Sequence, residues 1–271
     1  MNMTRKSFLR NSLLAAGALT LARKASADEP AAAAEPKAAE PKAEAPPAEP
    51  AAPKGPPAPP PPSAIHFPVL KPDQFDSKGM WKALKVKKKH KFIFESVHPH
   101  LIVPGLSSLY IHIQNALNSG EISMGWGKGK VASAAVLLGP SIVYSLNDAM
   151  WAKYPFGAAF GLKDAQGKPE TSNVYHKAQT ELSFDGDPGA GGNVYQDWSG
   201  EACIKRGTTF MVCHNALTAF SGMMAMQMGG DPKAALAEWK ANMLPGFMIV
   251  PSGVGALHAA MELGWQMMPL L

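Results

Sequence analysis

The chain has 271 residues, of which 26 are Lys or Arg and 21 are Asp or Glu, giving a formal net charge of +5. Five of the basic residues precede residue 28, where no acidic residue occurs, so the remainder carries 21 of each sign. This balance removes any chain-wide electrostatic attraction to nucleic acid or to an anionic membrane, and we expect no nucleic-acid partner. The length allows one or two domains, and we expect one because roughly the first sixty residues cannot pack a core.

The N-terminus has the three parts of a secretory signal. Arg5 and Lys6 lie in a charged start, an apolar stretch covers residues 13–22, and Ala25-Ser26-Ala27 has the small residues of a cleavage site. The Arg-Lys pair followed by Phe-Leu resembles a twin-arginine signal in which Lys6 replaces the second Arg. We therefore expect a signal peptide over residues 1–27, cleavage after Ala27 and a periplasmic location. The apolar stretch is shorter than the ~20 residues that span a bilayer, so we expect no stable membrane insertion.

Two segments separate the expected signal from the expected domain. Residues 28–63 are almost entirely Ala, Pro, Lys and Glu. Such a segment has nothing to bury against the entropy of ordering it, so we expect a disordered, semi-extended linker. Residues 64–91 form a basic segment with lysines at 82, 85, 87, 88, 89 and 91. We interpret this lysine run as a solvated, solubilising surface, with a docking patch as the alternative.

From residue 92 onward the sequence alternates between β-rich and helical patterns. Val131–Leu138 is a continuous apolar run of the kind found in buried parallel strands. The other expected strands are 92–97, 208–213, 247–250 and 265–268, and the expected helices are 106–117, 141–154, 198–206, 215–228, 232–243 and 254–263. Alternating strands and helices imply right-handed crossovers and a sheet covered on both faces. We therefore predict an α/β domain over residues 92–271, a three-layer α/β/α sandwich with a mostly parallel, roughly five-stranded sheet.

Residues 161–193 interrupt this alternation with a long polar segment rich in Gly and Pro. The segment is long for a structureless loop in a compact domain. We expect it to be a functional lid or a family-specific insertion.

The chain has two cysteines, Cys203 and Cys213, and an exported protein with two cysteines would ordinarily have one disulfide. Cys203 lies within an expected helix, and Cys213 lies at the far end of the strand that follows. Along the strand direction, five or six residues at about 3.3 Å each separate the two cysteines. That distance exceeds the ~6 Å between Cα atoms that a disulfide allows. We therefore expect two free thiols, with Cys203 as a small core residue.

Cys213 ends an expected strand and directly precedes an expected helix. Ligands of open α/β sheets bind outside the carboxyl ends of the strands, and a helix N-terminus there stabilises a thiolate or a bound anion. This position favours a reactive thiol, with an inert buried cysteine as the alternative.

The sequence around Cys213 resembles the second half of the DsrE-like (DsrE/DsrF) sulfur-relay domains. The segments that carry this resemblance are TFMVCHNAL at 209–217, LPGF at 244–247 and VPSGVGAL at 250–257, with weaker similarity at 136–140 and 147–151. The resemblance spans residues 92–268 and implies the three-layer fold and assembly as a homo-oligomer. It also implies that sulfur passes as a persulfide on the cysteine that ends the strand, here Cys213, from a small sulfur species or a sulfur-donor protein.

Further candidates lie at the same edge of the expected sheet. We predict Cys213 and His214 as catalytic residues, and Ser252, Gly253, His98 and His100 as substrate-binding residues. A Ser-Gly turn at a helix start presents backbone N–H groups that suit sulfite, thiosulfate or persulfide, with a plain turn glycine as the alternative for Gly253. The histidines and the cysteine could instead bind zinc or copper. Because no CxxC or HxxxH spacing supports that reading, we predict no metal and no cofactor.

Two functions remain open from the sequence. The first is an exported DsrE-like protein that binds or carries a reduced sulfur species as a persulfide on Cys213, as a sulfur carrier or a sulfurtransferase. The second is a non-catalytic periplasmic binding module that holds a metal or a small anion at the strand-end pocket. An exposed thiol at a helix N-terminus favours the first, and a buried thiol among aliphatic side chains favours the second.

Overall fold

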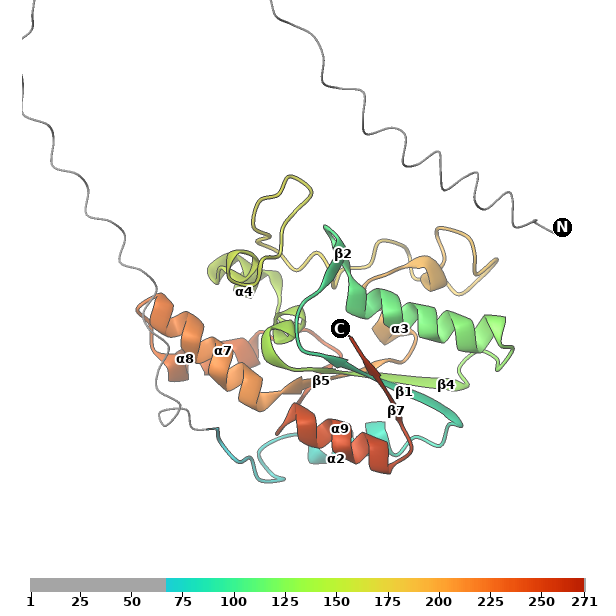
Figure 1. The fold of residues 1–271 in the computed structure, drawn as a ribbon, viewed down its shortest axis with the longest axis horizontal. Coiled ribbons are helices and arrows are strands. Elements are labelled where there is room, and N and C mark those ends of the chain that lie inside the picture. The colour runs from blue at the N-terminus through green and yellow to red at the C-terminus, as the bar shows by residue number, and fades with distance from the viewer. Residues whose placement is uncertain (1–66, 271) are drawn as a thin grey trace, which may run out of the picture. The chain divides into compact units, whose positions relative to one another are not determined.

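A five-stranded, all-parallel sheet in the order β6-β5-β4-β1-β7 forms the centre of the protein (Figure 1). The computed structural model describes residues 67–270, so the expected signal peptide (1–27) and linker (28–63) lie outside the described residues. The strands are β1 (His90–Ser96), β4 (Val131–Leu137), β5 (Thr209–Cys213), β6 (Phe247–Val250) and β7 (Gln266–Pro269).

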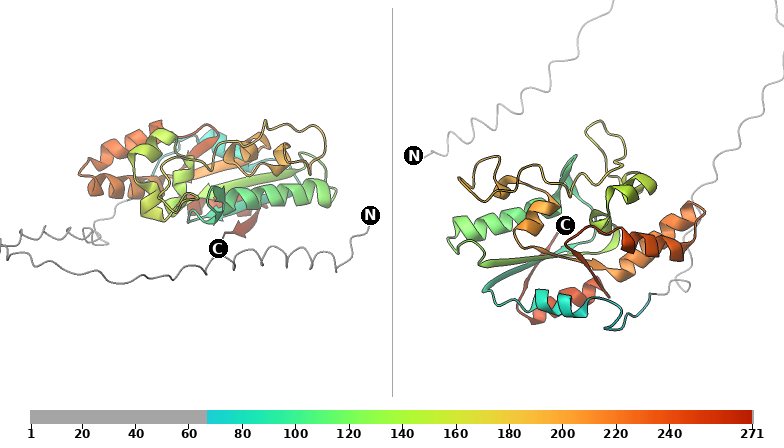
Figure 2. Two further views of the ribbon diagram at one scale, coloured as in Figure 1. Left: turned by 90° about the horizontal axis from the view of Figure 1, so that it is seen from above. Right: turned by 180° about the vertical axis from the view of Figure 1, so that it is seen from behind.

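Helices cover both faces of this sheet, which confirms the predicted three-layer α/β/α sandwich (Figures 1 and 2). One face carries α3 (Ser108–Asn118) and α6 (Gly200–Lys205), and the other carries α2 (Ser77–Leu84) and α9 (Gly253–Glu262). The other α-helices of residues 67–270 are α4 (Asp148–Lys153), α5 (Phe156–Phe160), α7 (His214–Gln227) and α8 (Pro232–Ala241).

The core lies on both sides of β4, the middle strand of the sheet, whose seven residues are all buried. Successive side chains of a strand point to opposite faces, so β4 and β5 each contribute to both layers. On the α3 side, the ring centroid of Phe210 lies 5.8 Å from that of Tyr110, which in turn lies 5.6 Å from Tyr144. The continuous apolar run at 131–138 is therefore a doubly covered parallel strand, as predicted.

The helix expected over 141–154 is two shorter helices. A 3-10 helix covers Gly139–Ser145 and α4 begins at Asp148. Between them Leu146 and Asn147 are extended, and the Asn147 side chain accepts a hydrogen bond from Met150 N at 3.2 Å. Asn is a favoured N-cap residue because its side chain satisfies an amide of the first helical turn, and this cap starts a new helix.

Several elements were not expected from the sequence, among them a hairpin and α2. The first residues of the helix expected over 106–117 belong to a hairpin, β2 (Leu101–Val103) with β3 (Leu106–Ser107), and α3 begins only at Ser108. Within the basic segment 64–91, α2 buries Met80 and Leu84. Trp265 Nε1 donates to Leu84 O at 2.9 Å, which ties α2 to the start of β7.

The segment 161–193 contains isolated bridges but no helix or strand within its described residues. It is nonetheless anchored to the domain, because Tyr175 is fully buried against Tyr144 and Trp151. Asp197, which follows the segment, accepts the backbone N–H groups of Gln179 and Thr180, both at 2.8 Å. These contacts fit a packed insertion better than a free lid.

Candidate functional site

The carboxyl ends of β5 and β6 meet where two helices leave the sheet toward opposite faces. Cys213 at the end of β5 pairs in register with Val250 at the end of β6. After β5, α7 packs against the 3-10 helix Gly139–Ser145, which lies on the α3 side, whereas α9 packs on the opposite face. Ligands of open α/β sheets bind at such a switch point, so the fold places Cys213 where the sequence predicted a site.

Cys213 is the N-cap of α7, and its Sγ accepts a hydrogen bond from Ala216 N at 3.5 Å. The positive end of the helix dipole and an amide N–H therefore both face the sulfur. Cys213 as a residue is only 5% exposed. The helix N-terminus favours the first of the two functions left open by the sequence, and the burial favours the second.

The first turn of α9 lies against the strands next to Cys213. Gly253 lies against Leu138 and Val136 of the β4 side, so the chain between Val250 and Gly253 crosses the end of β5. A Cβ at Gly253 would lie 1.8 Å from Leu138 Cδ2. Close packing therefore requires glycine here, and a positive φ does not. The sequence offered an anion-binding Ser-Gly turn or a plain turn glycine for Gly253, and neither describes this packing role.

Ser252 is the N-cap of α9, and its Oγ accepts from Gly255 N at 3.5 Å. The amides at the first two helical positions, Gly253 and Val254, have no acceptor within a helix. Two helix N-termini, those of α7 and α9, therefore converge on the end of β5. Such an arrangement suits a small anion or a sulfur-centred negative charge.

His214 follows Cys213 as the first residue of α7 and is 2% exposed. Within residues 67–270 neither ring nitrogen has a hydrogen-bond partner. Burial, assisted by the positive charge of Lys240, lowers the pKa of His214 to about 4 from its ordinary value of 6.5. The ring is therefore neutral at physiological pH and does not act as a positive partner for a thiolate.

This pKa predicts a specific acid sensitivity. Because the folded-state pKa lies below the unfolded value, the unfolded chain binds more protons at acidic pH. The stability that His214 contributes is fully present above its unfolded pKa and is lost as the pH falls through about 4. Between about pH 8 and pH 4 the loss should be up to about 3 kcal/mol. In urea unfolding across this pH range, His214→Phe should lose less unfolding free energy than the wild type. Equal losses in the two proteins would contradict the lowered pKa of His214.

His98 and His100 do not join Cys213. Both side chains are exposed, with ring centroids 5.7 Å apart. His100 O accepts from both N and Oγ of Ser108, which holds the pair at the start of α3. Strand alternation puts Cys213 on the same face as Met211, whose partner Val136 lies under α9. In the part of the chain that the structure describes, no three His, Cys, Asp or Glu side chains gather into a metal-binding group.

Cys203 is a fully buried core residue of α6, and both cysteines are free, as predicted. Burial raises the pKa of the Cys203 thiol well above its usual value. Sequence reasoning missed the donor Ala216 N and the charge of Lys240. The first follows from placing the helix start at residue 214, since the third amide of a helix faces its N-cap. No local signal identifies the second, because Lys240 reaches the site only through the packing of α8 on α7.

Comparison with known protein families, with curated proteins and with solved structures found no match to this chain. The DsrE-like resemblance therefore stays a prediction from the residues that carry it. Among residues 67–270 none of the helices combines the length and apolar character needed to cross a bilayer. Surface hollows of about 530, 450 and 420 Å³ are lined by residues other than the predicted site residues.

Proposed function

We propose that this chain is an exported, periplasmic DsrE-like protein that accepts a sulfur atom on Cys213 and carries it as a persulfide. The observation that carries the proposal is the position of Cys213 Sγ, which caps α7 and accepts from Ala216 N beside the start of α9. A persulfide has a low-pKa terminal sulfur, so the same amides and dipoles suit the loaded form as well as the free thiolate. Assembly as a homo-oligomer belongs to the same proposal.

The chemical step is a sulfur transfer without a net oxidation. The Cys213 thiolate attacks the outer sulfur of thiosulfate, or the outer sulfur of a donor protein's persulfide. A new S–S bond forms at Sγ, the S–S bond of the donor breaks, and sulfite or the donor thiolate leaves with the electron pair. Charge and electrons balance, and the thiol proton has already passed to solvent. Sulfide alone would need an oxidant and is therefore not a donor in this proposal.

The burial of Cys213 affects both the protection of the bound sulfur and the way in which it is loaded. Sulfur held under the first turn of α9 is sheltered from competing thiols, while loading requires Pro251–Gly253 to move aside. His214 contributes a neutral ring whose two nitrogens have no partner among the described residues. The ring can donate one hydrogen bond and accept another, so we assign it to hold the bound sulfur species.

The experiment is an intact mass measurement after incubation with thiosulfate. Wild type and Cys203→Ser should each gain about 32 Da, one sulfur atom, with release of an equal amount of sulfite. Cys213→Ser should gain nothing, and His214→Phe should load more slowly without losing the reaction. Sulfur retained by Cys213→Ser, or gained from sulfide alone, would overturn the proposal.

The 5% exposure of Cys213 also favours a second candidate, a non-catalytic module that holds a small anion between the starts of α7 and α9. In that case the amides of Gly253 and Val254 bind the anion and the thiol is only part of the wall. Calorimetric titration with sulfite separates the two functions. Affinity for sulfite that is unchanged in Cys213→Ser, together with no mass gain in the wild type, supports the binding module.

A further inference from the structure

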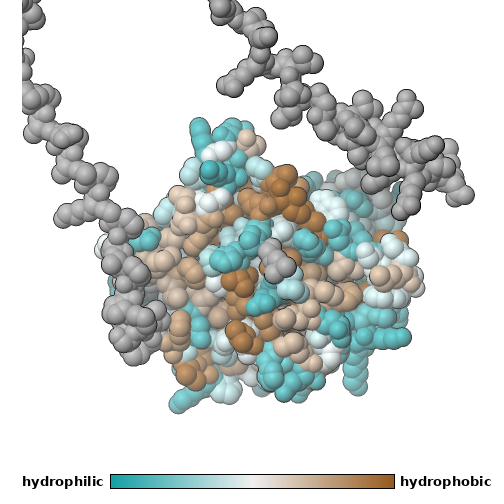
Figure 3. All heavy atoms as spheres, in the orientation of Figure 1, coloured by the Kyte–Doolittle hydropathy of each residue, from teal (hydrophilic) through white to brown (hydrophobic). Residues whose placement is uncertain are grey.

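Five exposed lysines meet at the amino-terminal edge of the sheet, opposite the Cys213 site. Lys87, Lys88 and Lys89 lead into β1, and Lys128 and Lys130 precede β4. The two strands are parallel neighbours with His90 opposite Val131, so the two groups of lysines lie side by side. Figure 3 shows hydrophilic residues gathered over the lower right of its view, where β1 begins. We call these five residues the amino-edge lysines.

The loop that carries Lys128 and Lys130 is held in one conformation. Gly125, Gly127 and Gly129 alternate along it, all with positive φ, a region that favours glycine. The backbone N–H of Gly127 donates to Glu121 O at 3.1 Å, and that of Gly129 donates to Glu121 Oε1 at 2.8 Å. Lys128, which lies between Gly127 and Gly129, and Lys130, which follows Gly129, are therefore presented on a fixed scaffold.

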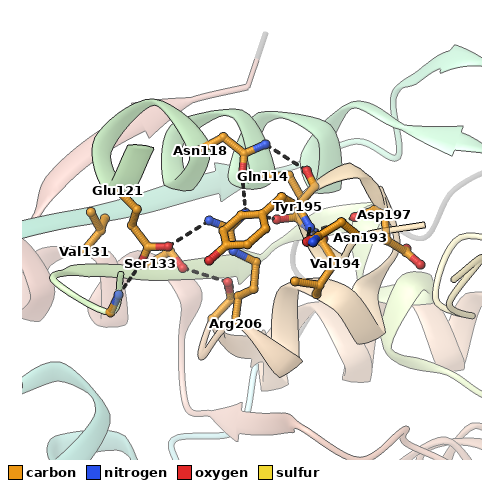
Figure 4. A network of polar contacts seen from close by, with 12 residues as sticks. Gln114, Asn118, Glu121, Val131, Ser133, Asn193, Val194, Tyr195, Asp197 and Arg206 are labelled. Atoms are coloured by element: carbon orange, nitrogen blue, oxygen red, sulfur yellow. Dashed lines mark hydrogen bonds and ion pairs between the residues drawn. The ribbon is translucent and has the colours of Figure 1, made fainter. Parts of the chain in front are cut away.

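Glu121 itself is held in place by an ion pair with Arg206. Its Oε2 lies 2.9 Å from a guanidinium nitrogen of the buried Arg206. Figure 4 shows the two side chains pointing toward each other. The carboxylate charge is thus neutralised inside the protein and does not offset the lysines outside. In the described part of the chain none of the amino-edge lysines forms an ion pair.

Two large apolar side chains protrude beside these lysines. Ile122 is 44% exposed and Met124 is 60% exposed, and both lie in the segment that joins α3 to the glycine-rich loop. The one large aromatic ring of this loop, Trp126, is stacked on His90 with centroids 3.6 Å apart and an interplanar angle of 6°. Its face toward His90 is therefore already occupied.

We propose that this edge docks the protein on an anionic phospholipid surface. Lysines attract the headgroup phosphates, and the neighbouring Ile122 and Met124 enter the boundary between headgroups and acyl chains. Nucleic acid fits less well, because protruding aliphatic side chains offer nothing to a phosphate backbone and the Trp126 ring is engaged with His90. The docking is peripheral and leaves the Cys213 edge, at the opposite ends of the strands, facing away from the lipid.

The test is cosedimentation of the full chain with vesicles of phosphatidylglycerol or of phosphatidylcholine. We expect binding to the anionic vesicles only, weakened by added salt. Each lysine near an anionic surface contributes about fivefold to affinity, so Lys128→Gln with Lys130→Gln should weaken binding about 25-fold. The matched control is Lys163→Gln with Lys168→Gln, two exposed lysines of the 161–193 insertion, which should bind as the wild type does. Because the N-terminal residues are also basic, the readout is the difference between these two double variants.

Ile122→Ser with Met124→Ser tests the apolar part, and it should weaken binding without changing the thermal unfolding midpoint. Equal binding by the two lysine variants would overturn the proposal. So would equal binding to both kinds of vesicle, or binding to a single-stranded oligonucleotide with none to anionic vesicles.

Discussion

Replacing Arg206 with methionine is expected to lower the free energy of unfolding by about 3–5 kcal/mol, because it leaves the buried carboxylate of Glu121 without its counter-charge. The two side chains are 1% and 6% exposed. The same guanidinium donates to Gln114 Oε1 and Asn118 Oδ1, both at 2.5 Å, and lies 4.4 Å from the ring centroid of Tyr195 (Figure 4). The substitution therefore removes the partners of several buried polar atoms at once.

Urea unfolding followed by circular dichroism measures this loss. The control is Lys153→Met, because Lys153 and Glu238 form an ion pair at 2.6 Å in which the lysine is half exposed, and such pairs contribute less than about 1 kcal/mol. Glu121→Gln combined with Arg206→Met should be more stable than Arg206→Met alone, since a neutral amide still accepts from Gly129 N. The explanation fails if the free energy of unfolding of Arg206→Met lies within about 1 kcal/mol of the wild-type value. It also fails if the double variant is no more stable than Arg206→Met, because the unpaired charge of Glu121 would then not be the cause of the lost stability.

The strands of the fold could be read from the sequence because their signals are local. Phe247–Val250 is identical in expectation and structure, and β4 and β5 differ by one residue at one end. Each is an apolar run with β-branched or aromatic residues beside a glycine or proline, which is the pattern of a buried parallel strand. The parallel order follows from the helices that separate them.

The missed elements depend on long-range packing or on a cap. The lysine run of residues 82–91 obscures the helical pattern of α2 in the sequence. The buried face of α2 is held by Trp265, which lies 181 residues from its partner Leu84 in the chain. The break between the two helices of 139–153 comes from the Asn147 cap, and Asn242 holds Asn147 through one backbone and one side-chain hydrogen bond. The Arg206–Glu121 ion pair joins residues 85 apart in the chain and has no local pattern.

The candidate site was predictable in position and not in accessibility. That Cys213 ends a strand and starts a helix follows from the sequence, and so does its distance from Cys203. Its burial depends on how closely Gly253 approaches Leu138, which only the packing of α9 on β4 determines. The sequence also placed His98 and His100 at the correct edge of the sheet, but the face on which they lie is set by the hairpin and by Ser108.

The reactivity of Cys213 relative to Cys203 follows from these environments. Sγ of Cys213 accepts from Ala216 N at a helix N-terminus, whereas Cys203 is fully buried and the pKa of its thiol is raised. Each pKa unit lowers a thiolate fraction tenfold, and only the thiolate reacts with an alkylating reagent. Near neutral pH Cys213 is therefore expected to alkylate faster than Cys203.

The rate of iodoacetamide labelling at each cysteine, measured by peptide mass spectrometry on the folded protein, tests this expectation most directly. Cys203 is the internal reference for a buried thiol, and labelling in denaturant, where both thiols should react alike, gives the intrinsic rate. The account predicts that Cys213 is labelled while the fold is intact and Cys203 remains unmodified. Equal rates at the two thiols, or no labelling of Cys213 until the protein unfolds, would contradict it.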